Sequence, residues 1–440
     1  MNGKTNARGF SYYDQFVETL DPASLHELQN RKLRTLIEEI SPNRFYQEKA
    51  RAGGIELAEI KTVDDLQRLP LTAKSDLVWD QQGNPPFGRI MTYPVSRYSH
   101  FHQTSGTTGK PLKCLDTLES WDWWARSWGY VYKAAGVTSS DVIFLAFSFG
   151  PYISHWVAIS GAWHIGALAV SGGGMNSEQR LRTIIETNCT VIVCTPTYAL
   201  RLAEVAQDNG IDLRNSAVRI GIHAGEPGAS LPNVRSAIER SWGALSFDHA
   251  GATEAGAWGF DCEARAGAIH LNEAEFVFDV IDPVSLLPVA DGVRGELVIT
   301  SLGRACMPAL RYRTGDLVER TAEPCQCGRT FARIKGGVLG RADDMMIVRG
   351  VNLYPAAVDD LIRGVDPVVE YEVDVRRVEG MDDLLVKIEV LDGASPEEVR
   401  RALIEGFKRQ FNIRVAAEVV PPGSLPRYEL KARRFKRINR

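Results

Sequence analysis

Residues 104–112 combine hydroxyls, glycines and one lysine in a pattern that suits phosphate binding: Thr104-Ser105-Gly106-Thr107-Thr108-Gly109-Lys110-Pro111-Leu112. Glycines let backbone N–H groups approach an anion closely, Ser and Thr hydroxyls donate to phosphate oxygens, and the lysine ammonium neutralises charge. The spacing Gly-x-x-Gly-Lys-Pro differs from the Walker spacing, which argues against an ordinary P-loop nucleotide hydrolase. The alternative is a flexible polar loop without a ligand.

Length and composition bound the class of protein. With 440 residues, of which 44% are hydrophobic, the chain can bury a sizeable core and form two or three domains. Its 51 basic and 55 acidic residues give a net charge of −4, so no overall positive field attracts nucleic acid, although the last ten residues are basic. No apolar run approaches the roughly 18 residues that cross a bilayer. Seven cysteines, an odd number, and no leading charged and apolar segment favour a cytoplasmic location.

Short apolar runs typical of buried strands alternate with helical patterns through the middle of the chain. The predicted strands are residues 142–147, 167–170, 191–194 and 218–223, and the predicted helices are residues 177–186, 198–207 and 232–242. This alternation predicts βαβ units that form a parallel sheet with helices on both faces. Residues 11–52 have mostly helical patterns.

The pattern changes toward the C-terminus. Beyond about residue 275, strands such as 295–300 and 318–320 are joined by Gly and Pro turns, which predicts a small β-rich part. After Gly340, a polar segment leads into alternating stretches at 371–375 and 384–391 and a helix that begins near Ser395. The predicted fold class is α/β. A large N-terminal domain, residues 1–341, has βαβ-type sheets flanked by helices, and residues 342–440 form a small mobile α+β lid domain.

Three further segments accompany the glycine-rich loop. They are Ala250-Gly251-Ala252-Thr253-Glu254, Tyr312-Arg313-Thr314-Gly315-Asp316-Leu317, and Gly340-Arg341-Ala342-Asp343-Asp344-Met345 with the following Val348-Arg349-Gly350-Val351-Asn352-Leu353-Tyr354-Pro355. In their order and separations, the four segments resemble the adenylate-forming superfamily of acyl-CoA synthetases, adenylation domains and luciferases. The resemblance covers nearly the whole chain.

Within this superfamily, the chain looks most like the phenylacetate-CoA ligase branch. The shortness of the chain and four local strings carry this resemblance. The strings are Cys194-Thr195-Pro196-Thr197-Tyr198-Ala199-Leu200, Gly225-Glu226-Pro227, Pro324-Cys325-Gln326-Cys327-Gly328-Arg329-Thr330 and Gly423-Ser424-Leu425-Pro426-Arg427.

The resemblance implies a reaction in two halves that uses ATP. A carboxylate is a poor electrophile, so these enzymes first join it to the α-phosphate of ATP and release pyrophosphate, and a nucleophile then displaces AMP. In the phenylacetate-CoA ligase branch the acid is aromatic and the nucleophile is coenzyme A. The sequence leaves open a carrier-protein thiol or another small nucleophile, as in a stand-alone arylic-acid activating enzyme of secondary metabolism.

The resemblance also implies residue roles. Glu254 would hold Mg²⁺ between phosphate oxygens, a role that suits a hard cation with oxygen ligands. The other matches are Thr104 to Lys110 for pyrophosphate, Thr253 for the α-phosphate, Asp316 with Arg341 for the ribose, and Gly225, Glu226 and Pro227 for the adenine slot.

Two residues near the C-terminal domain match mobile parts of the superfamily. Lys431 matches the catalytic lysine, whose ammonium would bridge the attacking carboxylate and the α-phosphate and stabilise the developing charge. Asp343 matches the hinge about which the lid rotates between half-reactions. The alternative for Lys431 is one lysine of a solvated basic tail.

Two positions depart from the superfamily pattern. Ala250 stands where an aromatic residue usually stacks on adenine, and His249 is the candidate substitute. Leu430 precedes the matched lysine where glycine is usual. These departures leave a second hypothesis open, that of a non-catalytic nucleotide-binding homologue that has kept the fold.

Four residues have the types and grouping of a metal site. Seven residues separate Cys262 from His270, and Cys325 and Cys327 form a Cys-x-Cys pair further along. Three thiolates and one imidazole suit tetrahedral Zn²⁺, and a closed set of four ligands would be structural. Some members of the resembled branch carry a comparable set. The alternative is that these cysteines are small buried hydrophobic residues.

The acid pocket is expected beside the strand at 142–147 and the helix after it, where the resembled superfamily binds its acid. The candidates are Phe147, Phe149, Tyr152, His155 and Ala224. The alternative is that the aromatic rings are plain core. Residues 147–152 lack the Gly-Gly pair common in the branch, so the acid need not be phenylacetate itself. We expect a monomer or a homodimer.

Overall fold

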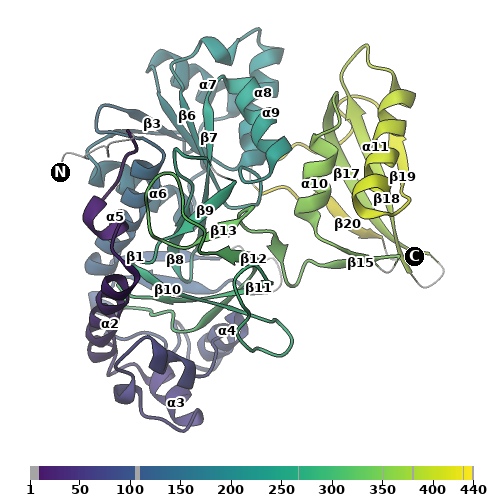
Figure 1. Cartoon of the computed structure of the whole chain (residues 1–440). Helices are drawn as coiled ribbons and strands as arrows, with labels where there is room; N and C mark the ends of the chain where they lie inside the picture. Colours follow the sequence, from purple (N-terminus) through teal and green to yellow (C-terminus); the bar gives the residue numbers. More distant parts are fainter. Residues whose placement is uncertain are drawn as a thin grey trace.

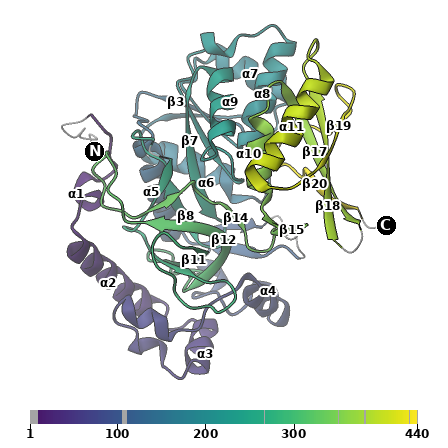
Figure 2. The same cartoon turned by 45° about the vertical axis from the view of Figure 1, so that its right-hand side comes forward.

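The computed structural model describes residues 9–104, 110–265, 267–349, 351–378, 381–429 and 431–438. A large N-terminal body carries strands β1 to β14, and a smaller C-terminal unit lies at one side of it (Figures 1 and 2). In the described chain the two parts are joined by residues 342–345, between β14 (Gly340–Arg341) and β15 (Met346–Val348). None of the helices in the described ranges is both long enough and apolar enough to cross a membrane.

The N-terminal helices lie at one end of the body (Figure 1). The helical prediction for residues 11–52 is confirmed by α1 (Gln15–Glu18), α2 (Pro22–Glu39) and α3 (Arg44–Ala52). Asp21 caps α2, because its carboxylate accepts hydrogen bonds from the amides of Ala23 and Ser24. Helix α4 (Lys74–Gly83) follows, and its first residue, Lys74, contacts Glu254.

The middle of the chain forms the parallel half of the large sheet. Its strands are β3 (Val142–Leu145), β4 (Leu168–Ser171), β5 (Val191–Cys194), β6 (Ile220–Ala224) and β7 (Leu245–Ala252). They are joined by α6 (Ile153–His164), α7 (Ser177–Glu186), α8 (Pro196–Asp208) and α9 (Pro232–Trp242). The strand order is β7-β6-β5-β3-β4, which confirms the predicted βαβ units.

Helices cover both faces of this parallel half. Ile143 and Val191 belong to the core that includes residues of α5 (Leu118–Ala134), whereas Phe144 and Ile192 belong to a second core with residues of α7, α8 and α9. Successive side chains of a strand point to opposite faces, so each strand contributes to both cores. This double burial explains why the strands are continuous apolar runs in the sequence.

The later strands of the body extend the same sheet. Strand β8 (Gly256–Phe260) pairs antiparallel with β7, and the order continues through β9, β13, β12 and β11 to β10. The predicted small β-rich part is therefore continuous with the parallel sheet, because the chain turns back after β7 and pairs along its edge. The bounds are β9 (Ala268–Leu271), β10 (Phe276–Ile281), β11 (Arg294–Ser301), β12 (Tyr312–Thr321) and β13 (Arg333–Lys335), and β14 pairs with β12.

The C-terminal unit has a sheet and a core of its own. The strand order is β16-β15-β18-β17-β20, with β19 also paired to β18. Val348, Val373, Val386, Leu403 and Phe407 are among the buried residues of its core. The remaining bounds are β16 (Val351–Leu353), α10 (Pro355–Arg363), β17 (Val368–Val378), β18 (Met381–Val390), α11 (Pro396–Phe411), β19 (Ala416–Val419) and β20 (Phe435–Ile438).

The predicted C-terminal helix begins after Ser395, as expected, but the Ser395 side chain makes no capping hydrogen bond. The predicted strands at 371–375 and 384–391 fall on the long hairpin β17–β18. The predicted division of the chain into domains 1–341 and 342–440 stays a prediction.

Candidate active site

A β-hairpin holds the base of the glycine-rich loop. Strands β1 (His100–Gln103) and β2 (Lys113–Asp116) pair along their whole length. The amide of Thr104 donates to the carbonyl of Leu112 at 3.0 Å, and the amide of Leu112 donates to Thr104 Oγ1 at 3.1 Å. Lys110 is exposed. The hairpin thus fixes where the loop begins and ends; the predicted phosphate-binding residues Ser105, Gly106, Thr107, Thr108 and Gly109 lie outside the described residues.

A buried arginine fixes the backbone of the Thr253-Glu254 pair. Arg304 Nη1 donates to the carbonyl oxygens of Thr253 and Glu254, each at 2.9 Å. Its Nε and Nη2 donate to the two oxygens of Asp116 at 2.7 and 2.8 Å. The exposed fractions of the two side chains are 1% and 0%. Because Asp116 ends strand β2, this pair links the hairpin of the loop to the Thr253-Glu254 turn.

The Glu254 carboxylate lies against a lysine that the sequence analysis did not select. Lys74 Nζ, at the start of α4, is 2.9 Å from Glu254 Oε1. The Glu254 side chain is 8% exposed. Lys74 is far from Glu254 in the sequence, and the only local signal near it is a helix start at which Asp76 caps the amide of Ala73. The structure therefore adds Lys74 to the candidate site.

Asp316 and Arg341 are brought side by side by strand pairing. Residue 316 of β12 is paired with residue 341 of β14, and Arg341 Nη1 is 3.4 Å from Asp316 Oδ1. Burial raises the pKa of Asp316 to about 6, although Arg341 and Lys431 act in the opposite direction. Arg341 Nε also donates to Asp343 Oδ1 at 2.9 Å, and the Asp343 side chain is half-exposed. The hinge candidate thus lies in the short link between the two parts of the molecule.

Lys431 lies among charged residues of the body. Its Cε would be 3.5 Å from a Cβ placed on Gly225. Loss of hydration lowers the pKa of Lys431, and the carboxylates of Glu226 and Asp316 oppose that effect. The residue still keeps solvent-accessible surface. The fold therefore brings the lysine of the C-terminal unit to the acidic residues of the body while leaving it accessible to a small molecule.

The Ala224-Gly225-Glu226-Pro227 segment follows the end of β6. Ala224 is buried. Gly225 has a φ of +95°, a backbone conformation that residues with a side chain rarely adopt. The two oxygens of Glu226 accept hydrogen bonds from the amides of Thr197 and Ala432, each at 3.0 Å. This segment thus contacts both α8 and the residue after Lys431.

His249 and Ala250 lie on β7. His249 is buried, its Nδ1 is 2.8 Å from the carbonyl oxygen of Gly259, and its ring centroid is 4.5 Å from that of Trp128. Burial lowers the pKa of His249 to about 4. The ring is therefore engaged within the core, and adenine stacking by His249 stays a prediction without support from this geometry.

The acid-pocket candidates divide into core and exposed rings. Phe147 and His155 are buried, whereas Phe149 and Tyr152 are 54% and 43% exposed. The rings of Phe149 and His155 meet edge to face at 4.9 Å, and His155 Nε2 is 3.3 Å from Ser171 Oγ. Only Phe149 and Tyr152 of these four present an open aromatic surface. Nearby, Arg180 is buried without an ion pair among the described residues, and its Nε donates to the carbonyl of Gly172.

The four metal-ligand candidates meet in the body. The ligand atoms of Cys262, His270, Cys325 and Cys327 all lie within 4.8 Å of one another, and all four residues are buried. The Sγ atoms of Cys262 and Cys325 are 3.8 Å apart, and Cys327 Sγ is 3.4 Å from His270 Nε2. Zinc bonds of roughly 2.3 Å to sulfur and about 2.0 Å to nitrogen set tetrahedral ligands ~3.5 to 3.8 Å apart. These two separations are close to that range, and the other ligand atoms lie near enough for one ion to draw the set together.

The surroundings of the cluster orient its ligands. His270 Nδ1 is 3.3 Å from the carbonyl oxygen of Phe331, which leaves Nε2 as the ligand atom. The Tyr12 hydroxyl donates to the carbonyl of Cys327, and the buried Arg329 pairs with Glu18. The cluster is thus tied to the N-terminal segment. The remaining cysteines, Cys114, Cys189, Cys194 and Cys306, are also buried.

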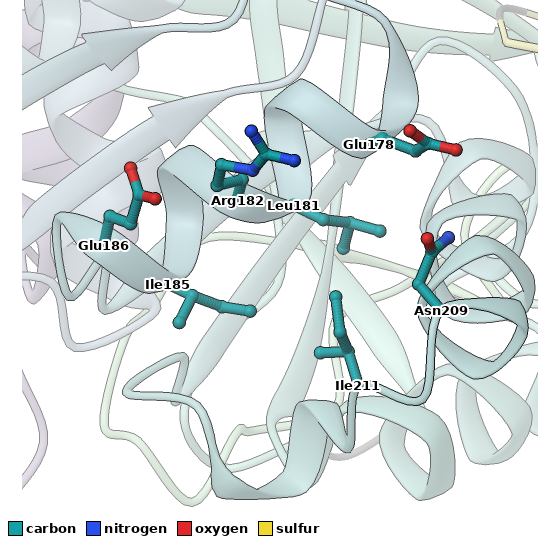
Figure 3. A pocket seen from close by; sticks show the side chains of 7 residues that line it. All are labelled: Glu178, Leu181, Arg182, Ile185, Glu186, Asn209 and Ile211. Carbon is teal, nitrogen blue, oxygen red and sulfur yellow. The ribbon is translucent and has the colours of Figure 1, made fainter.

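A hollow of about 200 Å³ lies beside α7 (Figure 3). Leu181 and Ile211 point toward each other across it, and charged side chains of α7 lie at its rim. Its lining residues are Glu178, Leu181, Arg182, Ile185, Glu186, Asn209 and Ile211. None of them was predicted to be a site residue, so the candidate site is identified by its side-chain chemistry rather than by this hollow.

Comparisons with known proteins agree with this arrangement. Residues 101–307 match the AMP-binding enzyme family, and residues 350–437 match the AMP-binding enzyme C-terminal domain. The phenylacetate-coenzyme A ligase of Thermus thermophilus is 30% identical over 439 aligned residues, which cover 95% of this chain and 97% of that protein.

Solved structures of a 2-hydroxyisobutyryl-CoA ligase are also similar. The form in the postadenylation state with 2-HIB-AMP is 28% identical and has a TM-score of 0.90, covering 95% of this chain and 90% of that one. The form with 2-HIB-AMP and CoA in the thioesterification state is 29% identical and has a TM-score of 0.74, with coverage of 99% and 94%. The two parts of this chain are therefore arranged more as in the postadenylation form than as in the thioesterification form.

The buried pair of Asp116 and Arg304 generates a stability prediction. Asp116→Asn leaves a buried guanidinium without its counter-charge, so we expect the free energy of unfolding to fall by about 3–5 kcal/mol. Urea unfolding followed by tryptophan fluorescence measures the loss. Asp122→Asn, the same change at an exposed position of α5, is the control and should stay within about 0.5 kcal/mol of the native chain. Equal stability of the two variants would contradict the role of the Asp116–Arg304 pair in stabilising the fold.

Proposed function

Because the chain belongs to the phenylacetate-CoA ligase branch of the AMP-binding enzyme family, we propose that it activates a carboxylic acid as an acyl-adenylate and transfers the acyl group to coenzyme A. The observation that carries the proposal is the position of Lys431 against the body. Its Cε would be 3.5 Å from a Cβ on Gly225, and the amide of the next residue donates to Glu226. Catalysis of this kind needs positive charge held where negative charge develops. The similarity to a ligase solved with an acyl-adenylate supports the first half of the reaction.

In the first half-reaction, a carboxylate oxygen of the acid attacks the α-phosphorus of ATP. The bond from that phosphorus to the bridging oxygen breaks, and pyrophosphate leaves with the electron pair. We assign to the Lys431 ammonium the neutralisation of charge on the two reacting anions, and to Thr253 a hydrogen bond to the α-phosphate. We assign to Asp316, with Arg341 beside it, hydrogen bonds from the ribose hydroxyls. We assign Thr104 and Lys110 to the loop that binds the pyrophosphate.

The residues near Glu254 fit a magnesium ion. Mg²⁺ is usually bound by one or two carboxylates together with substrate phosphates, and Glu254 would provide one such carboxylate. When bound, the ion neutralises phosphate charge. Lys74, 2.9 Å from the same carboxylate, supplies a second positive charge on this side of the site.

In the second half-reaction, the thiolate sulfur of coenzyme A attacks the acyl carbon, and the bond to the phosphate oxygen breaks so that AMP leaves. The relatives of this chain that are named as CoA ligases support coenzyme A as the acceptor. No contact in the described residues favours a carrier protein instead.

We assign an aromatic acid as the substrate class. The support is the exposure of two aromatic rings, Phe149 and Tyr152, beside the strand end where the acid is expected, and the naming of the Thermus thermophilus relative for phenylacetate. Ala224, at the end of β6, is the further candidate for this pocket. We assign a structural zinc ion to the cluster Cys262, His270, Cys325 and Cys327. The support is that three thiols and one imidazole, donor types that zinc prefers, have ligand atoms within 4.8 Å of one another.

Acid-dependent exchange of labelled pyrophosphate into ATP tests the proposal. Across benzoates, hydroxybenzoates, aminobenzoates and phenylacetates, we expect exchange with at least one acid. In Lys431→Ala, exchange should fall by about 10²–10³-fold, the usual cost of removing one charge stabiliser from a transition state. Thioester formation from a supplied acyl-adenylate should be affected much less. ATP binding without exchange for any acid would instead favour a non-catalytic homologue.

The raised pKa of Asp316 predicts a pH dependence of ATP binding. The pKa is about 6, so below that pH the carboxyl becomes protonated and loses an acceptor for the ribose hydroxyls. The KM for ATP in the exchange assay should therefore rise by up to ~10-fold for each pH unit below about 6. Asp316→Asn is the control, because its KM should be high at every pH. A native KM that stays constant from pH 5 to 7 would contradict the role.

The zinc assignment predicts the metal content. After exhaustive dialysis, we expect about one zinc ion per chain, measured by mass spectrometry of the metal. Cys325→Ser should lose the metal and unfold at a lower temperature, because metal binding contributes folding free energy. Cys189→Ser, a buried cysteine outside the cluster, should keep its zinc. Less than about half an equivalent in the native protein would sink the assignment.

A further inference from the structure

The Glu226 carboxylate joins the body to the C-terminal unit at the residue next to Lys431. Oε1 accepts a hydrogen bond from the amide of Thr197, in the first turn of α8, and Oε2 accepts one from the amide of Ala432. Both distances are 3.0 Å. Thr197 belongs to the body and Ala432 follows Lys431 directly. One side chain therefore holds two backbone amides on opposite sides of the boundary.

Thr197 makes a second connection across the same boundary. Its Oγ1 accepts from Arg434 Nη1 at 3.2 Å. Arg434 is in turn held within the C-terminal unit by Glu370, with distances of 2.6 and 3.1 Å. Ala432 and Arg434 both follow Lys431 closely, so the segment that carries the lysine is fastened to the first turn of α8 through Glu226 and Thr197.

Glu226 also acts on the charge of Lys431. Desolvation lowers the pKa of Lys431, and among the charged groups that oppose this effect Glu226 is the strongest, ahead of Asp316. An ammonium is needed to stabilise the reacting anions, so a neighbouring carboxylate keeps Lys431 in its useful form. The same side chain thus fixes the position of the lysine backbone and favours its charged state.

The bridge exists only while the C-terminal unit occupies this position. The chain superposes on the 2-hydroxyisobutyryl-CoA ligase with a TM-score of 0.90 in the postadenylation state, 0.74 in the thioesterification state and 0.72 in an open conformation. A hydrogen bond of 3.0 Å between two parts breaks when one part moves by more than about 1 Å. The contact is therefore specific to one of the arrangements that this fold adopts.

We propose that Glu226 is a positioning residue that holds Lys431 in the acid-activating arrangement and releases it for thioester formation. The role rests on the proposed two-step reaction and deepens it. It differs from the expected place of Glu226 in the adenine slot, because its two oxygens contact Thr197 and Ala432. The second half-reaction does not need the bridge.

Three variants test the role. Glu226→Ala removes the carboxylate, and Glu226→Gln keeps one acceptor but loses the charge. Asp360→Asn is the matched control: Asp360 of α10 accepts from the amide of Asn233 at 2.9 Å, so it crosses the same boundary without contacting the Lys431 segment. Each variant is assayed for pyrophosphate exchange and for thioester formation from a supplied acyl-adenylate, with the acid that the native enzyme uses best.

We expect Glu226→Ala to lower the kcat of exchange by about 10²-fold, the cost of misplacing a reacting group by about 1 Å. Thioester formation should stay within about threefold of native, and Asp360→Asn should cost less than about threefold in either assay. In Glu226→Gln, the loss of exchange activity at high pH should move to lower pH, because removal of a negative charge lowers the pKa of Lys431. Equal losses in both half-reactions, or an unmoved pH profile, would overturn the role.

Limited trypsin digestion separates this inference from the proposed function. Without substrates, cleavage after Lys431 and Arg433 should be several-fold faster in Glu226→Ala than in the native chain or Asp360→Asn, because the segment is released. Cleavage sites are read by mass spectrometry. Equal cleavage in all three proteins would refute the bridge even if exchange is active. Absence of exchange in the native enzyme would refute the proposed function and leave the digestion result to judge the bridge.

Discussion

The site depends on one buried ion pair, Arg304 with Asp116. The pair joins the end of the hairpin that carries the glycine-rich loop to the carbonyls of Thr253 and Glu254. A buried guanidinium is stable only when its charge and its donors are satisfied, so these groups hold one another in a single arrangement. The elements that we propose to bind phosphate are thereby placed relative to each other without a nucleotide, which would reduce the reorganisation that the proposed reaction requires.

Much of this architecture is predictable from the sequence, because its signals are local. Residues 142–147 and 191–194 are continuous apolar runs since both of their faces are buried, and the helices between them have their own periodicity. The four metal-ligand candidates follow from residue type and grouping, whereas the acidic residues near Lys431 follow from the resemblance of their motifs to the adenylate-forming superfamily. The structure then brings each group together.

The parts that were missed depend on long-range contacts. Lys74 contacts Glu254 although the two residues are far apart in the sequence. Nothing in the residues next to Lys74 in the sequence distinguishes it from a surface lysine. The antiparallel strands continue the parallel sheet because of a pairing between β7 and β8 that alternation alone does not indicate. The sequence analysis placed Glu226 only in the adenine slot, because its contact with the amide of Ala432 depends on how the C-terminal unit lies against the body.

Because the link at residues 342–345 is short, the C-terminal unit stays close to the surface of the body that it contacts. A short tether maintains an effective concentration on the order of mM, so the two surfaces meet repeatedly without needing a large interface. A hydrogen bond contributes about 1 kcal/mol, so gain or loss of a single bond changes the ratio of bound to released unit about fivefold. In the two-step reaction proposed above, docking of the C-terminal unit on the body would therefore respond to small chemical changes in the site, and the unit would bind and release without forming a tight complex.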